Sequence, residues 1–168
     1  MRTGKSDYKI IRVTPTLDTT EAYAVGDVAF VATEIPNAVI GNGGCSKIVN
    51  AYLMDQDRDA YILQAIFTEK NTALGTINAT ANISDADMEA IGLCGVSFFQ
   101  YDTASTTHID QVTVIKQQSL SGASESVEPM LIQAADDSTS VYVSGIISTG
   151  TPTFAAADDL DLILHIER

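Results

Sequence analysis

The sequence predicts an all-β fold, namely an antiparallel jelly-roll-like β-sandwich of about eight strands with one short helical turn. Runs rich in Val, Ile, Tyr and Phe recur along the chain and are separated by turn residues. Only one short stretch carries the signals of a helix. A length of 168 residues fits one domain. We assign residues 1–20 to an N-terminal basic arm and residues 21–168 to a single sandwich domain.

The first strand-forming segment, 26–35, is apolar in both of its alternating sets of residues. Val28 and Phe30 belong to one set, and Ala29 and Val31 belong to the other. A strand that is apolar on two faces must be covered on both. We expect the cover to be a second sheet plus a loop, or a neighbouring subunit.

The next two segments predict an antiparallel hairpin. Residues 46–54 and 60–67 are both rich in β-forming residues, and the acidic run 55–59 separates them. The polar, small residues of 68–83 are typical of a long connection.

A helical turn is predicted over 84–91. Ser84 is a favoured N-cap, and Asp85 and Asp87 fall in the first turn, where the helix dipole favours negative charge. Gly92 is a favoured terminator.

The second half of the chain is again strand-forming, apart from a Ser/Gly-rich loop at 119–127. The expected strands are 93–101, 109–117, 129–135, 140–147 and the final segment 160–167. The final segment has the clearest period of two, because its leucines and Ile166 alternate with Asp161, His165 and Glu167. We therefore expect His165 on the outward face of its sheet or in a subunit contact.

The net charge of −13 disfavours binding to nucleic acid or to an anionic membrane. The charge is uneven, because the first twelve positions include Arg2, Lys5, Lys9 and Arg12. These residues form either a basic arm that binds an acidic partner surface or a solvated terminus. We find neither a secretory signal nor an apolar run of transmembrane length, so we expect synthesis in a reducing cytoplasm. Cys45 and Cys94 are expected to be small buried thiols.

Motifs that resemble functional sites are incomplete. The acidic run 55–59 begins like a calcium loop, but Ala60 and Ile66 replace the glycine and glutamate that such a loop needs. We interpret it as an acidic loop tip, and the aspartates of 136–137 and 158–161 as solvated turn residues. The segment 41–47 is not a phosphate loop, because a strand is expected to follow it.

Catalytic chemistry is not indicated. His108 and His165 are the only histidines, and neither has a serine or cysteine in a nucleophile-elbow setting. A metal-dependent oxidase on a jelly roll would need clustered histidines and a third ligand. We therefore predict no catalytic residue, no metal and no cofactor, and a protein that is not an enzyme.

Four segments carry a family resemblance: 20–28 (TEAYAVGDV), 43–49 (GGCSKIV), 84–87 (SDAD) and 151–166 (TPTFAAADDLDLILHI). In this order they resemble small virion proteins encoded near the major capsid gene of tailed bacteriophages. The resemblance covers residues 20–168. It implies a head decoration, or cement, protein whose jelly-roll core clamps neighbouring major capsid subunits.

The resemblance also implies partners and a location. The partners are the major capsid protein and other copies of the chain, with a homotrimer favoured over a homodimer. The location is the capsid exterior, after synthesis in the host bacterial cytoplasm. The candidate contact residues are Arg2, Lys5, Lys9, Arg12, Phe30 and His165. Two alternatives stay open, a head-fibre or tail-associated module that binds host carbohydrate and a minor tail or neck component.

Overall fold

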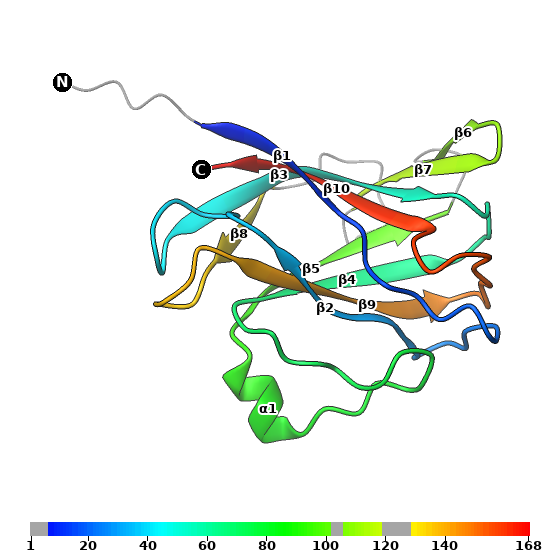
Figure 1. Ribbon diagram of the computed structural model, residues 1–168, viewed down its shortest axis with the longest axis horizontal. Coiled ribbons are helices and arrows are strands. Elements are labelled where there is room, and N and C mark those ends of the chain that lie inside the picture. Colours follow the sequence, from blue (N-terminus) through cyan, green and yellow to red (C-terminus); the bar gives the residue numbers. More distant parts are fainter. Residues whose placement is uncertain (1–6, 102–105, 119–128) are drawn as a thin grey trace.

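The computed structural model describes residues 7–101, 106–118 and 129–168. Two antiparallel sheets pack face to face, and one short helix lies below them (Figure 1). The elements are β1 (Tyr8–Val13), β2 (Val28–Ile35), β3 (Cys45–Asp55), β4 (Ile62–Thr68), α1 (Asp85–Ala90), β5 (Leu93–Gln100), β6 (Thr106–Ile109), β7 (Val112–Lys116), β8 (Met130–Gln133), β9 (Val141–Thr149) and β10 (Leu160–Glu167). The predicted all-β sandwich is confirmed.

The strand order is that of a jelly roll. The upper sheet of Figure 1 has the order β1-β10-β3-β7-β6, and β8 also pairs with β3. The lower sheet has the order β2-β9-β4-β5. The chain crosses between sheets from β1 to β2, from β2 to β3 and from β3 to β4, then from β5 to β6, and again from β8 through β9 to β10. Within the described residues, the hairpin β6–β7 is an addition to the eight jelly-roll strands.

The predicted hairpin of 46–54 and 60–67 is wrong. These segments become β3 and β4, which belong to different sheets. A run of turn residues between two strands is compatible with a hairpin and with a crossover between packed sheets. The choice depends on which partners the strands find: β3 pairs with β10, β7 and β8, and β4 pairs with β5 and β9.

The predicted basic arm of residues 1–20 also differs from the structure. Tyr8–Val13 forms the edge strand β1, which pairs antiparallel with β10 along its whole length. Ile11 and Val13 are buried in the core, 5% and 4% exposed, so the segment is held by apolar contacts as well as by the ladder. From Tyr8 to Val13 the chain is therefore part of the sandwich.

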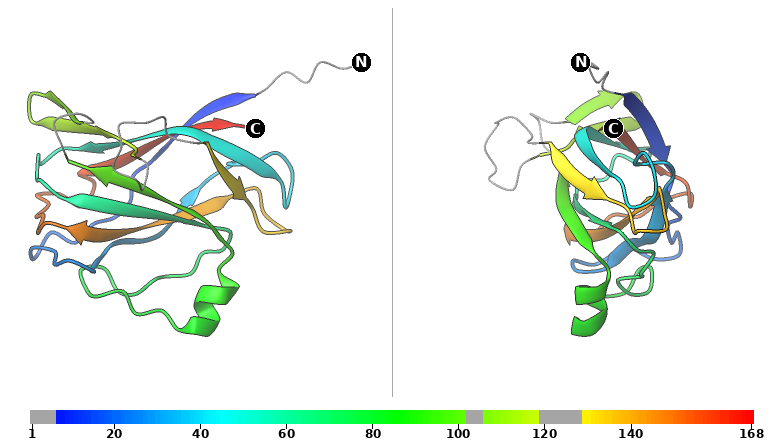
Figure 2. Two further views of the ribbon diagram at one scale, coloured as in Figure 1. Left: turned by 180° about the vertical axis from the view of Figure 1, so that it is seen from behind. Right: turned by 90° about the vertical axis from the view of Figure 1, so that its left-hand side faces the viewer.

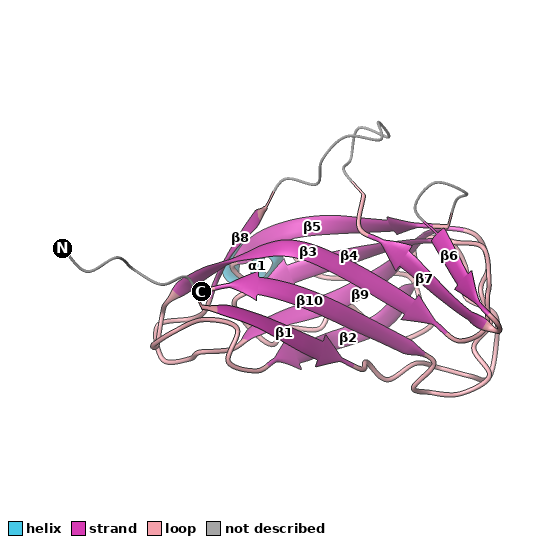
Figure 3. Cartoon of the chain, turned by 90° about the horizontal axis from the view of Figure 1, so that it is seen from above, coloured by secondary structure: helices cyan, strands magenta, loops and turns pink. Residues whose placement is uncertain are grey.

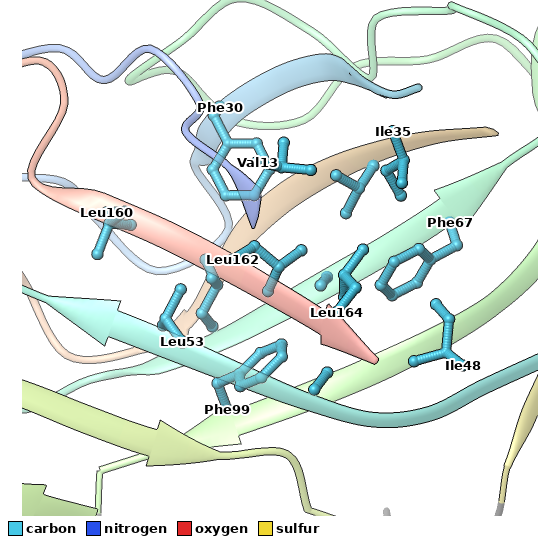
Figure 4. Close-up of a cluster of buried hydrophobic side chains, with 14 of the residues drawn as sticks. Val13, Phe30, Ile35, Ile48, Leu53, Phe67, Phe99, Leu160, Leu162 and Leu164 are labelled. Carbon is cyan, nitrogen blue, oxygen red and sulfur yellow. The ribbon is translucent and has the colours of Figure 1, made fainter. Parts of the chain in front are cut away.

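The core is built around the apolar stripe of β10. Leu160, Leu162, Leu164 and Ile166 are each no more than 1% exposed. Figure 4 shows the stripe facing Phe67 and Phe99 from the lower sheet, with Leu53 of β3 beside it. The period of two seen in the sequence thus marks the face of β10 that is buried between the sheets.

The outer face of the lower sheet is covered by the chain itself. The segment 69–92, which includes α1, places Leu74 and Ile91 on Val28 and Ile66 in a second apolar cluster (Figure 1). This segment also binds the edge of β2, since Asn78 N donates to Val28 O at 2.9 Å. Of the two covers expected for the apolar strand 26–35, the structure has the second sheet plus a loop.

The predicted helical turn is confirmed. The Ser84 side chain accepts a hydrogen bond from Asp87 N at 3.1 Å, as an N-cap does. Gly92 follows with a φ of 66°, a left-handed conformation that favours glycine.

We expect Gly145→Ala to destabilise the sandwich. Phe30 and Gly145 are paired between β2 and β9, and the Phe30 ring lies over the glycine. An added Cβ would stand 2.8 Å from Phe30 Cδ1, and Phe30 is 1% exposed and has little room to move. The free energy of unfolding should fall by about 1–3 kcal/mol in a denaturant titration.

The control is Phe30→Leu, alone and combined with Gly145→Ala. If the clash is the cause, the double variant loses less stability than the sum of the two single variants. Additive losses would contradict this explanation.

Candidate interaction surface

The outer face of the upper sheet is left uncovered by the described chain. Figure 3 looks down on this face and shows β1, β10, β3 and β7 in front, with α1 behind the sandwich. The lower sheet, by contrast, carries its own covering segment. One sheet is therefore shielded on both sides and the other on one side.

The strand register defines how side chains are arranged on this face. One row across the sheet consists of Arg12, Ile163, Tyr52 and Lys116. The neighbouring rows are Asp161, Met54, Val114 and Thr107 on one side, and Ile10, His165 and Asn50 on the other. The centre is thus aromatic and aliphatic, and charged groups stand at its margins. We call these eleven residues the upper face.

The centre of the upper face is held in place by local contacts. Asn50 Nδ2 donates a hydrogen bond to the Tyr52 hydroxyl at 2.9 Å. The rings of Tyr52 and His165 lie 5.5 Å apart between centroids, at an angle of 57°. These contacts hold the Tyr52 side chain in one orientation. A side chain that is already ordered loses less conformational entropy when a partner binds, which favours binding.

The predicted contact residues are only partly brought together. Arg2 and Lys5 lie outside the described residues. Arg12 and His165 lie on the upper face, and Lys9 is half-buried on β1. Arg12 Nη1 lies 3.6 Å from Asp161 Oδ2. The prediction that Phe30 contacts a partner is wrong, because Phe30 is 1% exposed and packs inside the sandwich.

Positive charge gathers around the upper sheet. Of the nine basic residues, Arg2 and Lys5 are outside the described part, which leaves seven. Five of these seven lie on the strands of the upper sheet or directly after β10: Lys9, Arg12, Lys47, Lys116 and Arg168. The covering segment of the lower sheet instead carries Glu69, Asp85, Asp87 and Glu89, against one lysine, Lys70. The same strands also carry Asp55, Asp161 and Glu167, so positive charge exceeds negative charge there only slightly, and an acidic partner surface would be attracted weakly to the upper sheet.

Sequence reasoning missed the centre of the upper face, which is formed by Ile163, Tyr52 and Met54. A signal for Ile163 was present, since it alternates with the buried leucines of its strand and so had to point outward. That Tyr52 and Met54 lie beside it depends on the pairing of β3 with β10, which the sequence does not show.

The aspartates of two loops form a second polar feature at one end of the sandwich. Asp57 Oδ2 accepts a hydrogen bond from Ala155 N at 2.8 Å, and Asp59 Oδ2 accepts one from Thr153 N at 2.6 Å. Burial and the neighbouring Asp159 carboxyl raise the pKa of Asp57, whereas the hydrogen bond from Ala155 lowers it. These carboxylates bind the loop after β3 to the loop before β10.

Solvated turn residues were predicted at 158–161. This holds for Asp158, which is exposed, and is wrong for Asp159 and Asp161. Asp159 and Asp161 are 7% and 6% exposed. Asp161 accepts a hydrogen bond from the Thr14 hydroxyl, and Asp159 O accepts one from Gln56 N at 3.1 Å. No group of three or more His, Cys, Asp or Glu side chains within the described ranges is arranged to hold a metal ion. The Asp161 carboxylate thus joins β10 to the segment after β1, whereas the Asp159 carboxylate accepts from Ala156 N within its own loop at 2.5 Å, and the bond of Asp159 to Gln56 is made by its backbone carbonyl.

Asp55 is the most deeply buried of these acids, at 0% exposed. Its Oδ1 accepts a hydrogen bond from Asp57 N at 2.8 Å. The Tyr61 hydroxyl approaches the same carboxyl, but neither it nor Asp55 Oδ2 makes a hydrogen bond of ordinary geometry. Burial raises the pKa of Asp55 to about 6, and the nearby Asp57 and Asp59 add to the rise.

The remaining sequence candidates do not converge on a site. His108, on β6, contacts the Tyr101 hydroxyl through Nε2 at 3.2 Å and Thr113 Oγ1 through Nδ1 at 3.1 Å. Cys94 is half-buried, but Cys45 is exposed, which corrects the expectation of a buried thiol there. Cys45 starts β3 on the solvent side of the upper sheet.

Comparison with protein-family models, with curated proteins and with solved structures finds no match for this chain. In the part of the chain that the structure describes, no helix is both long and apolar enough to cross a membrane. Function must therefore be inferred from the surface itself and from the resemblance in the sequence.

We expect Asp55→Asn to change how stability depends on pH. The pKa of Asp55 is about 6 in the folded protein and near 3.8 when the residue is exposed. The folded state therefore binds the proton more tightly, and stability falls as the pH rises from about 4 to about 7. Over this pH range Asp55 alone should lower the free energy of unfolding by about 3 kcal/mol. At pH 7.5 the variant should be more stable than the wild type, and near pH 4 the two should be similar.

Denaturant titrations at several pH values measure this difference directly. Asp57→Asn is the control, because Asp57 lies in the same loop but is more exposed than Asp55 and should change the pH profile less. A stability difference between wild type and Asp55→Asn that does not vary with pH would contradict the assignment.

Proposed function

We propose that the chain is a structural virion protein that decorates a bacteriophage capsid and stabilises it by clamping neighbouring major capsid subunits. The single observation that carries this proposal is the upper face, an ordered apolar centre with charged margins that the described chain leaves open. A surface of this composition is typical of the protein-binding patches of soluble proteins.

Three further features support the proposal. The resemblance of segments 20–28, 43–49, 84–87 and 151–166 is to small virion proteins of tailed bacteriophages. The jelly-roll strand order is the architecture which that resemblance implies. The basic residues around the upper sheet would attract an acidic capsid surface, even though the whole chain is strongly negative. Many copies bound to a repeating lattice would add their weak contacts by avidity.

The alternative, a fibre- or tail-associated module that binds host carbohydrate, is favoured by one observation. Tyr52, Asn50 and His165 lie together on the upper face, where an aromatic ring beside an amide and an imidazole could receive a sugar. Binding of the purified chain to a glycan array would favour this alternative over decoration.

The decisive variant for capsid binding is Tyr52→Glu, which places a charge at the centre of the upper face. Tyr52 lies outside the core, so the protein should fold, but its copies per phage head should fall at least tenfold because a central aromatic contact is lost. Quantitative gel analysis of purified heads measures this number.

Met88→Glu is the matched control, since it makes the same change in charge on α1, at a residue 37% exposed on the opposite side of the sandwich. Its copies per head should stay at the wild-type level. Heads that lack the protein should also rupture at a lower temperature than complete heads. Equal rupture temperatures, or equal copies of Tyr52→Glu and wild type, would contradict the proposal.

A further inference from the structure

β1 is a free edge of the upper sheet. Its one strand neighbour within the described residues is β10. At the corresponding edge of the lower sheet only the start of β2 is paired, because the segment 77–81 bonds to residues 26–28. Proteins usually cover or interrupt a long edge strand, because unpaired backbone groups recruit another strand. The six residues of β1 therefore need an explanation.

The backbone groups that point to the free edge can be identified. Asp7 and Arg168 exchange both backbone hydrogen bonds, which makes them a hydrogen-bonded pair of the antiparallel ladder. Because such pairs alternate, the N–H and C=O groups of Tyr8, Ile10 and Arg12 point away from β10. The free edge thus offers three donors and three acceptors at every second residue.

The side chains of the same three residues are also exposed. Tyr8 is 66% and Ile10 is 67% exposed, and the Arg12 side chain is 57% exposed. They share the outer side of the sheet, since Ile11 and Val13 point into the core. An exposed aromatic and an exposed isoleucine beside unpaired backbone groups combine the two features of an edge that binds another strand.

We propose that two copies of the chain pair through β1, antiparallel and about a twofold axis at Ile10. In this register Ile10 of one copy faces Ile10 of the other, and Tyr8 of each copy faces Arg12 of the other. Each of these three residue pairs closes two backbone hydrogen bonds. The two upper sheets become one continuous sheet across the dimer.

The side chains select this register over its neighbours. Ile10 against Ile10 is an apolar pair, and Tyr8 against Arg12 brings an aromatic ring to a guanidinium. On the core side of the sheet, Lys9 of one copy lies opposite Ile11 of the other copy and not opposite a second lysine. An axis at Lys9 would instead set two lysines directly opposite each other, which is unfavourable. The segment is self-complementary in the way that an isologous interface requires.

This inference does not depend on the proposed function, because pairing at β1 uses Ile10 and Arg12 at the margin of the upper face and leaves its centre open to a different partner. A twofold axis makes a dimer, whereas the sequence resemblance favoured a trimer. The net charge of −13 per chain opposes association, so dimerisation should strengthen as salt screens the repulsion.

Paired charge variants of Ile10 test the inference in the full-length chain. Ile10→Lys alone and Ile10→Glu alone should each weaken the dimer at least tenfold, because like charges meet at the axis. An equimolar mixture of the two variants should recover a one-to-one heterodimer. Sedimentation velocity and native mass spectrometry measure the masses against the 17.8 kDa chain. Leu131→Lys, at a residue 58% exposed on β8, is the control and should dimerise as the wild type does.

A second variant tests the backbone directly. Ile10→Pro removes an N–H that faces the free edge, and the ladder to β10 keeps all its hydrogen bonds. It should be a folded monomer, with a circular dichroism spectrum like that of the wild type. The inference is overturned if the wild-type chain is monomeric at millimolar concentration or is a trimer. It is also overturned if the variant mixture forms no heterodimer, or if Ile10→Pro dimerises normally.

Discussion

Burial of the apolar stripe of β10 is the contact on which the rest of the structure depends. This stripe closes the core between the sheets, and β10 carries β1 on one edge and β3 on the other. Without it, the segment after Asp7 would have neither a ladder nor a core to join, and its basic residues would form an arm. Because strands alternate, burying the leucines also forces Ile163 and His165 outward. The upper face is thus a direct consequence of how the core is filled.

The outer faces of the two sheets differ in how far the described chain covers them. The lower sheet is shielded by the chain's own segment 69–92, which packs Leu74 and Ile91 on it and bonds to the edge of β2. The residues that the structure describes leave one face of the upper sheet and its edge on β1 uncovered. Both openings lie on the same side of the molecule, where most of the described basic residues gather. Both surfaces that we propose to bind a partner therefore belong to the upper sheet.

Much of the local structure could be predicted from residues close together in the sequence. Ser84 and Gly92 mark the ends of α1 because a cap and a left-handed terminator act within one turn. The buried face of β10 follows from its alternation. The predictions that were wrong concern long-range contacts. Segments 46–54 and 60–67 look like a hairpin in the sequence, yet they form β3 and β4, which lie in opposite sheets. The acidic loops look solvated, yet Asp55 is fully buried.

The sequence by itself determined the fold class, the position of the helix and the buried face of β10, because these depend on period and on local capping. Only the tertiary structure decided which strands are neighbours. That choice brings Tyr52 beside Ile163 and His165, leaves Ile10 on a free edge, and removes Phe30 from the surface. The physical reason is that strand pairing joins residues far apart in the chain. Any one strand could form equally good backbone hydrogen bonds with several others, so the hydrogen bonds alone do not choose its neighbour. Packing of the complete core selects among them.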